Sequence, residues 1–183
     1  KSIKPNLDII LRHVSGALFE EAHKEVVFFD HQLDLFGGIS SKHKSKINQY
    51  SSVHYTPAYI ARTIVENSLR ELELSKKKSI KIMDPSCGSS EFIIEALKQL
   101  KNIGYKGEIE IWGYDVSDTA IHTSKFLLHY ENETQWQGKL KLNFSKVDNS
   151  LEIEWGNDID LLLMNPPFIS WELMKNKSER DIL

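Results

Sequence analysis

Residues 79–102 place a short apolar strand, a turn of small residues and an amphipathic helix one after another. The strand occupies 79–83, and the turn begins the segment DPSCGSSEF at 84–92. Apolar residues then return at helical spacing, at Phe92, Ile93, Ala96, Leu97 and Leu100. Such a turn lets a ligand approach the backbone N–H groups at the start of the helix. It lacks the glycine pattern of a dinucleotide fingerprint and the Gly-Lys pair of a P-loop, so it predicts neither of those sites.

The alternation of strand and helix patterns continues to residue 164 and predicts a doubly wound α/β sheet. Strands are predicted at 79–83, 108–114, 139–147 and 159–164, and helices at 90–102 and 118–131. Upstream, apolar residues at helical spacing predict a long helix from about residue 6 to residue 36. The polar residues 39–53 predict a loop, and Thr56-Pro57 opens a second helix that runs to about Leu74.

Asn165-Pro166-Pro167-Phe168 follows the apolar run 159–164, at the carboxyl end of a predicted strand. Open α/β sheets bind their ligands at that end of their strands. The prolines stiffen the turn and remove two backbone donors, while their carbonyls remain free to accept. An amide oxygen, a carbonyl oxygen and an aromatic ring there suit a planar amino group that stacks on the ring. A simple proline-rich turn has the same letters, so this motif alone does not decide between the two interpretations.

Two more acidic residues stand where predicted strands end. Asp84 follows the strand at 79–83 and is placed to accept a hydrogen bond from a cationic or amine-bearing ligand. Asp115 ends the next strand, where an acid can accept from both hydroxyls of a ribose. Both are also common turn formers. We expect Asp118 to act mainly as the N-cap of the helix that begins there.

Residues 84–92 resemble the S-adenosylmethionine motif D-P-x-C-G-S-G-x-F of N6-adenine DNA methyltransferases, and residues 165–168 resemble their catalytic N-P-P-[YF]. Residues 54–61 resemble the Y-T-P segment that precedes the first motif in those proteins. This order is similar to that of type I modification subunits and of many type II and fused restriction–modification enzymes. Ser90 stands where the family usually has a third glycine, which predicts less backbone freedom there.

The resemblance implies a partial Rossmann-like, S-adenosylmethionine-dependent methyltransferase sheet over 54–183, behind an N-terminal helical segment and polar loop at 1–53. It implies S-adenosyl-L-methionine as the cofactor and adenine N6 in DNA as the methyl acceptor, within a restriction–modification system. It places the cofactor site at Tyr55, Thr56, Pro57, Asp84, Pro85, Cys87, Gly88, Ser89, Phe92, Asp115, Val116, Asp148 and Asn149.

Some roles within that site are more specific. Tyr55 and Thr56 would approach the methionine end of the cofactor, with Thr56 also available as a helix cap. Asp148 would hold the amino group of the cofactor's adenine, although an Asp-Asn pair also forms turns. Phe92 has the core as its alternative.

The resemblance also assigns the catalytic groups. The target adenine must leave the double helix, because its N6 is paired inside the stack. The Asn165 side-chain oxygen and the Pro166 carbonyl would accept the two N6 hydrogens, Pro167 would stiffen the turn, and Phe168 would stack on the base. The expected partners are double-stranded DNA with a flipped adenine and a specificity or restriction subunit or fused domain.

Composition adds limits. Cys87 is the single cysteine, so no internal disulfide is expected, and a reducing, cytoplasmic setting is predicted. Neither CxxC nor HExxH occurs, so no metal site is expected, and no apolar run approaches membrane-spanning length. The net charge of −3 is not typical of a DNA-binding surface. The lysine clusters at 42–46 and 76–78 are read as solvated loops, with phosphate contact as the alternative for the first.

Two other classes of function remain open. The same motif serves methyltransferases that act on RNA bases or on a protein glutamine amide. A non-catalytic cofactor-binding or docking module is the second alternative. The chain lacks an initiator Met, and fewer strands are predicted than the seven of the family sheet. We therefore expect a fragment with an apolar edge at 161–164 that binds cofactor weakly and does not methylate alone.

Overall fold

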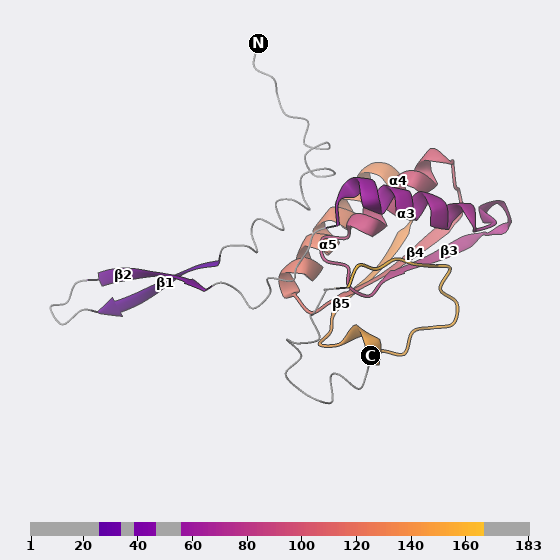
Figure 1. Ribbon diagram of the computed structural model, residues 1–183. Helices are drawn as coiled ribbons and strands as arrows, with labels where there is room; N and C mark the ends of the chain where they lie inside the picture. Colours follow the sequence, from indigo (N-terminus) through magenta and orange to yellow (C-terminus); the bar gives the residue numbers. More distant parts are fainter. Residues whose placement is uncertain (1–25, 34–38, 47–55, 167–183) are drawn as a thin grey trace, which may run out of the picture. The chain divides into compact units, whose positions relative to one another are not determined.

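The computed structural model describes residues 26–33, 39–46 and 56–166 (Figure 1). The chain divides into two compact units. Of the described residues, one unit contains 56–166, and the other contains 26–33 and 39–46. Each unit is described by itself.

The first unit is built on a parallel sheet with the strand order β5-β4-β3-β6. Its strands are β3 (Ser79–Asp84), β4 (Glu108–Asp115), β5 (Leu140–Lys146) and β6 (Leu161–Leu162). Its α-helices are α3 (Ala58–Arg70), α4 (Glu91–Asn102) and α5 (Asp118–Glu131), which lie together on one side of the sheet in Figure 1. Shorter helical turns occur at Leu74–Lys76, Asn132–Trp136 and Ser150–Glu152. The predicted α/β class is confirmed.

One face of this sheet forms the core. Alternate residues of neighbouring strands are in register and buried, as with Ile82, Ile111 and Leu161. They join apolar residues of all three helices in one cluster, including Val65 of α3 and Leu97 of α4. The period of two along each strand explains this face, because successive side chains point to opposite sides.

From residue 79 to residue 147, the bounds of the strands and α-helices are predicted to within one residue, whereas the helical turn at Asn132–Trp136 is not predicted. Two other predicted bounds are wrong, and the alternative role of Thr56 as a helix cap is excluded. The helix α3 ends at Arg70 rather than near Leu74, and Thr56 does not cap it, because Pro57 is the N-cap position and makes no side-chain cap bond. Strand β6 is shorter than the predicted 159–164. Before its start, the Lys81 backbone N–H donates to the Asp160 carboxylate at 2.8 Å rather than to a backbone carbonyl.

The predicted role of Asp118 as an N-cap is also wrong. Ser117 is the N-cap of α5, and its side chain accepts from the Ala120 N–H at 3.3 Å. Asp118 is the first helical residue and pairs with Lys146 across 2.9 Å. An acid one residue inside the helix still favours the positive end of the helix dipole.

In the second unit, the predictions for the described residues are wrong. Residues Val26–Leu33 form strand β1, which pairs antiparallel with β2, Ile39–Lys46. The helical spacing of Val26 and Phe29 coincided with a run of β-branched and aromatic residues, which favours a strand. The lysine cluster at 42–46 accordingly lies in a strand rather than in a loop. The parts of the predicted helix at 6–25 and 34–36 and of the predicted loop at 47–53 lie outside the described residues.

Candidate active site

The predicted motifs follow the carboxyl ends of the parallel strands and therefore lie together at that end of the sheet. The turn after β3 is tied to the end of β4 by the Cys87 N–H, which donates to the Tyr114 carbonyl at 2.8 Å. The end of β4 is tied to the segment after β5 by the Val147 N–H, which donates to the Asp115 carbonyl at 2.9 Å. On the other side of β3, the Leu163 N–H donates to the Met83 carbonyl at 2.9 Å, just before Asn165.

The turn at 84–90 requires unusual backbone angles. Gly88 has φ +51° and Ser90 has φ +64°, both in the left-handed region. Such angles cost a residue with a side chain about 1–2 kcal/mol, which a third glycine would avoid. Ser90 is held there by a buried hydrogen bond from its hydroxyl to the Ser124 hydroxyl, at 2.7 Å. The Ser124 hydroxyl in turn donates to the Gly88 carbonyl at 2.8 Å.

Asp84 is a buried carboxyl at the start of this turn, with 2% of its surface exposed. Burial raises the pKa of Asp84 to about 7; the nearby charge of Asp115 acts in the same direction, and the Ser86 N–H, 3.0 Å away, opposes it. Near neutral pH, both the protonated and the ionised form of the Asp84 carboxyl are therefore populated. A cationic ligand beside it would favour the ionised form.

Asp115 links the turn to the next helix. One carboxylate oxygen accepts from the Gly88 N–H and the other from the Ser117 N–H, each at 2.9 Å. Each oxygen keeps further lone-pair capacity, so the carboxylate can still accept from ligand hydroxyls. Its half-buried position beside the glycine turn suits that role, which remains a prediction.

The other predicted cofactor residues have different surroundings. Phe92 is buried in the core, and Val116 is exposed. Asp148 is exposed just beyond β5, whereas the Asn149 side chain is engaged locally with the Leu151 N–H and the Glu152 carboxylate. Pro85 and Ser89 are buried within the turn.

Cys87 is buried against Ser124, and burial raises the pKa of its thiol far above the ordinary value. Only the thiolate is a good nucleophile, so this cysteine is a packing residue of the turn.

The structure describes two residues of the predicted catalytic motif, Asn165 and Pro166. Asn165 is half-buried, and its Nδ2 donates to the Thr56 Oγ1 at 2.9 Å. Thus the predicted Y-T-P segment and the predicted catalytic motif meet, although 109 positions separate them. Tyr55, Pro167 and Phe168 lie outside the described residues.

A family model for N-6 DNA methylases matches residues 34–182. The chain belongs to the N-6 DNA methylase family. It is 28% identical over 137 residues to the type II methyltransferase M.BanIII of Aneurinibacillus aneurinilyticus, with 68% of this chain and 23% of that protein covered. It is 26% identical over 114 residues to the type I restriction enzyme MjaVII methylase subunit of Methanocaldococcus jannaschii, covering 62% and 18%. The chain therefore spans less than a quarter of the length of these relatives.

The fold comparison agrees with the family. A crystal structure of a class I S-adenosylmethionine-dependent methyltransferase from Listeria monocytogenes superposes with a TM-score of 0.53 at 18% identity. The match covers 89% of this chain and 42% of that chain. The fold of the chain is thus a partial Rossmann-like methyltransferase sheet, as predicted.

Two features of the site were not predicted from the sequence: the Ser90–Ser124 pair and the Thr56–Asn165 bond. Ser124 lies 34 positions from Ser90, on a helix whose local pattern gives no sign of this contact. The glycine-to-serine departure at Ser90 was the available signal, because a side chain at a left-handed position needs a compensating partner.

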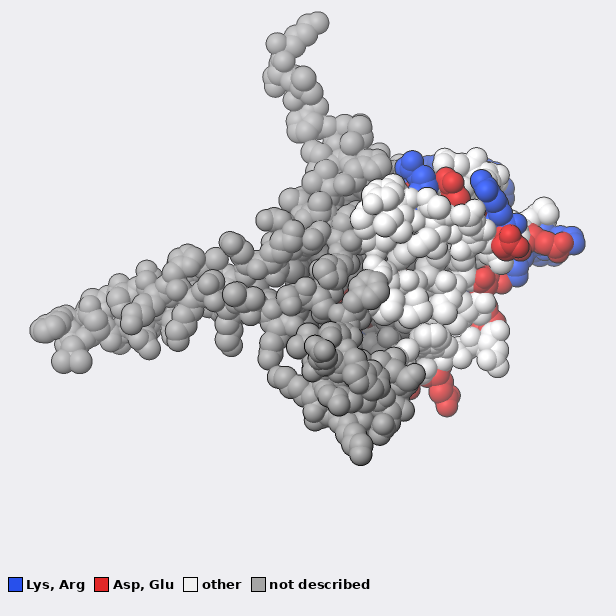
Figure 2. Space-filling view, viewed as in Figure 1, with Lys and Arg blue, Asp and Glu red and all other residues white. Residues whose placement is uncertain are grey.

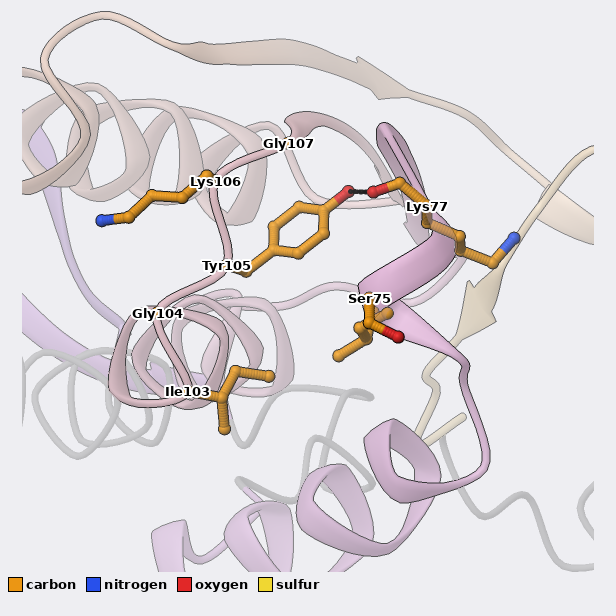
Figure 3. A pocket seen from close by; sticks show the side chains of 8 residues that line it. Ser75, Lys77, Ile103, Gly104, Tyr105, Lys106 and Gly107 are labelled. Carbon is orange, nitrogen blue, oxygen red and sulfur yellow. Dashed lines mark hydrogen bonds between the residues drawn. The ribbon is translucent and has the colours of Figure 1, made fainter.

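A shallow hollow of about 320 Å³ lies elsewhere (Figure 3). Its lining includes Lys77, Ile103, Tyr105 and Lys106, and the Tyr105 hydroxyl donates to the Lys77 carbonyl at 3.3 Å. These residues precede β3 and β4, so the hollow is at the amino ends of the strands. It is therefore separate from the candidate active site.

The described surface gives little sign of a nucleic-acid interface on the face shown in Figure 2. Most of that described surface is uncharged, and its Lys, Arg, Asp and Glu residues are intermingled. Among the described residues, no group of three or more His, Cys, Asp or Glu side chains is arranged to hold a metal ion. No helix in the described ranges has both the length and the apolar character needed to cross a membrane.

Proposed function

We propose that this chain forms the cofactor-binding and catalytic part of a methyltransferase that transfers a methyl group from S-adenosyl-L-methionine to adenine N6 in DNA. The observation that carries the proposal is the position of Asn165. Its amide lies at the carboxyl end of the strands, as Asp84 and Asp115 do, and its Nδ2 donates a hydrogen bond to Thr56. Membership of the N-6 DNA methylase family supports the choice of adenine N6.

The residues at the sheet edge fit the proposed cofactor. Asp84 would accept from its amino group, Asp115 from its ribose hydroxyls and Asp148 from its adenine amino group. The turn at 84–90 brings backbone close to the bound molecule, because Gly88 offers no side chain. When bound, S-adenosylmethionine supplies the electrophilic methyl group.

The chain's own part in the chemistry would be positioning. The Asn165 Oδ1 and the Pro166 carbonyl would accept the two N6 hydrogens, and the Phe168 ring would stack on the flipped base. Holding both hydrogens directs the nitrogen lone pair toward the methyl donor. Positioning of this kind requires fixed hydrogen-bond acceptors and an aromatic face. In many enzymes, such positioning supplies a large part of the rate acceleration.

Asn165→Ala in the full-length natural protein tests the proposal. The single-turnover rate of radiolabelled methyl transfer to unmethylated bacterial DNA should fall by about 100-fold or more, because an acceptor used in the transition state is lost. Nucleoside analysis of the product should show N6-methyladenine in the unmutated protein. Asn67→Ala is the matched control, since among the described residues the exposed Asn67 side chain bonds only to the Thr63 carbonyl and, weakly, to Arg70. Near-normal transfer by the Asn165 variant would sink the proposal.

The same assay addresses the substrate class. An amide oxygen paired with a carbonyl would also hold the amino group of an RNA base or the amide of a protein glutamine. RNA and total protein extract are therefore offered in parallel with DNA, and preferential labelling of either would replace DNA as the substrate. We further propose a cytoplasmic setting and a partner specificity or restriction subunit or fused domain, in line with the type I methylase subunit among the relatives.

A further inference from the structure

We propose that Thr56 is a positioning residue that holds the Asn165 amide with its oxygen directed at the methyl-accepting amino group. This inference rests on the proposed function, because it assigns the Asn165 oxygen the role of acceptor. It gives the hydroxyl of Thr56 a task other than direct contact with the cofactor.

The contact is specific and long-range in sequence. The Asn165 Nδ2 donates to the Thr56 Oγ1 at 2.9 Å, within the range of a good hydrogen bond. Thr56 directly precedes the Pro57 N-cap of α3, and Asn165 follows β6, so the bond joins the start of a helix to the end of a strand. Both side chains are half-buried.

The orientation of the amide decides what Asn165 offers a ligand. An asparagine side chain has one oxygen that accepts and one nitrogen that donates, and rotation by half a turn exchanges them. With Nδ2 bonded to Thr56, the oxygen is the end left for a ligand. Within the described part of the chain, no hydrogen bond reaches the Asn165 Oδ1. The opposite orientation would present a donor to an amino group whose hydrogens also need acceptors.

The Thr56 hydroxyl is not needed to begin its helix. Pro57 is the N-cap position of α3, and no side chain caps the helix there. The proline following Thr56 narrows the backbone conformations open to Thr56, which gives its side chain a stiff support. Behind it, α3 is fixed to the core by buried Ala61 and Val65. A stiffly supported hydroxyl with no capping duty is suited to holding a second side chain.

The test compares Thr56→Val with Thr56→Ser in the full-length natural protein. Valine keeps the shape and removes the hydrogen bond, whereas serine retains the hydroxyl. Thr63→Val is the matched control, because its exposed hydroxyl donates only to the Tyr59 carbonyl one turn earlier in the same helix. Two quantities are measured: the S-adenosylmethionine dissociation constant by calorimetry, and the single-turnover methyl transfer rate at saturating cofactor on unmethylated bacterial DNA.

We expect Thr56→Val to lower the saturated rate by about 10- to 100-fold, because a misplaced acceptor loses transition-state contact. The dissociation constant should change by about twofold or less, and Thr56→Ser should recover most of the rate. Should the valine variant fail to fold, Thr56→Ala removes the hydroxyl without adding an apolar branch, and it is compared with serine instead.

The other outcomes separate this inference from the proposed function. If Asn165→Ala abolishes transfer while Thr56→Val behaves like Thr63→Val, the positioning role is wrong and the proposed function stands. If Thr56→Val weakens cofactor binding but leaves the saturated rate unchanged, Thr56 contacts the cofactor and the inference is overturned. If Asn165→Ala itself retains transfer, the proposed function fails first.

Discussion

The Asp84 carboxyl is the buried acid at the centre of the candidate site, and its ionisation has a cost. Burial raises its pKa to about 7, whereas the ordinary value is 3.8. Between these values the folded protein binds a proton that the unfolded chain has lost. The contribution of Asp84 to stability therefore falls as pH rises from about 4 and levels off above about 7. A buried acid of this kind is tolerated where a cationic ligand group offsets the charge.

Asp84→Asn tests this assignment, because asparagine resembles the protonated acid and can still accept from the Ser86 N–H. Without cofactor, the variant should match the unmutated protein at or below about pH 4 and exceed its stability at pH 8, by a few kcal/mol at most. Thermal unfolding at pH 4 and pH 8 measures the difference. An equal effect of the substitution at both pH values would contradict the raised pKa.

At this scale, sequence patterns located the acids because each follows a recognisable strand. Asp84 and Asp115 indeed end β3 and β4, and Asn165 follows β6. The contacts that hold these residues could not be predicted in the same way. The Thr56–Asn165 hydrogen bond joins side chains 109 positions apart, and local sequence periodicity cannot predict a contact between such distant residues.

Between elements, Ser124 of α5 fastens the turn that leads from β3 into α4. Its hydroxyl accepts from the buried Ser90 hydroxyl and donates to the half-buried Gly88 carbonyl. Ser124→Ala should cost about 1–3 kcal/mol of unfolding free energy, because it removes the hydrogen-bond partner of both groups. Urea unfolding measures this loss, with exposed Ser145→Ala as a control that should change little.

A second substitution distinguishes fastening of the turn from loss of packing. Ser90→Gly removes both the unpaired hydroxyl and the cost of the left-handed backbone at φ +64°. Added to Ser124→Ala, it should therefore restore much of the lost stability, and the two effects should be non-additive. Simple additivity in the double variant would show that the two serines do not act as a pair.

The elements themselves were predictable where one periodicity dominates. From residue 79 to residue 147, strands alternate with helices whose apolar stripes are clear, and their bounds are correct to within one residue. The prediction for residues 26–33 was wrong because the spacing of Val26 and Phe29 fits a helical stripe as well as a strand. Pairing with β2, a non-local interaction, decides between the two conformations.

At the scale of the whole molecule, the edge of the sheet formed by β6 determines whether the chain associates when it is studied alone. Within the described residues, β6 pairs with β3 on one side only. Along β6 and the two residues after it, Leu161 and Leu163 are buried, whereas Leu162 and Met164 are 43% and 38% exposed. An apolar strand edge of this kind invites pairing with another chain, and a charged residue there opposes it.

Residues 1–183 alone should therefore associate as their concentration rises, and Leu162→Lys should shift them toward monomer. Size-exclusion chromatography with light scattering, over a tenfold or wider concentration range, measures both effects. Leu151→Lys is the matched control, because Leu151 is 58% exposed but lies in the turn at Ser150–Glu152 and not on β6. Equal effects of the two substitutions would assign the association to general surface apolarity. If the unmutated chain stays monomeric at every concentration, the exposed edge of β6 is covered. Residues beyond those described would then protect this strand.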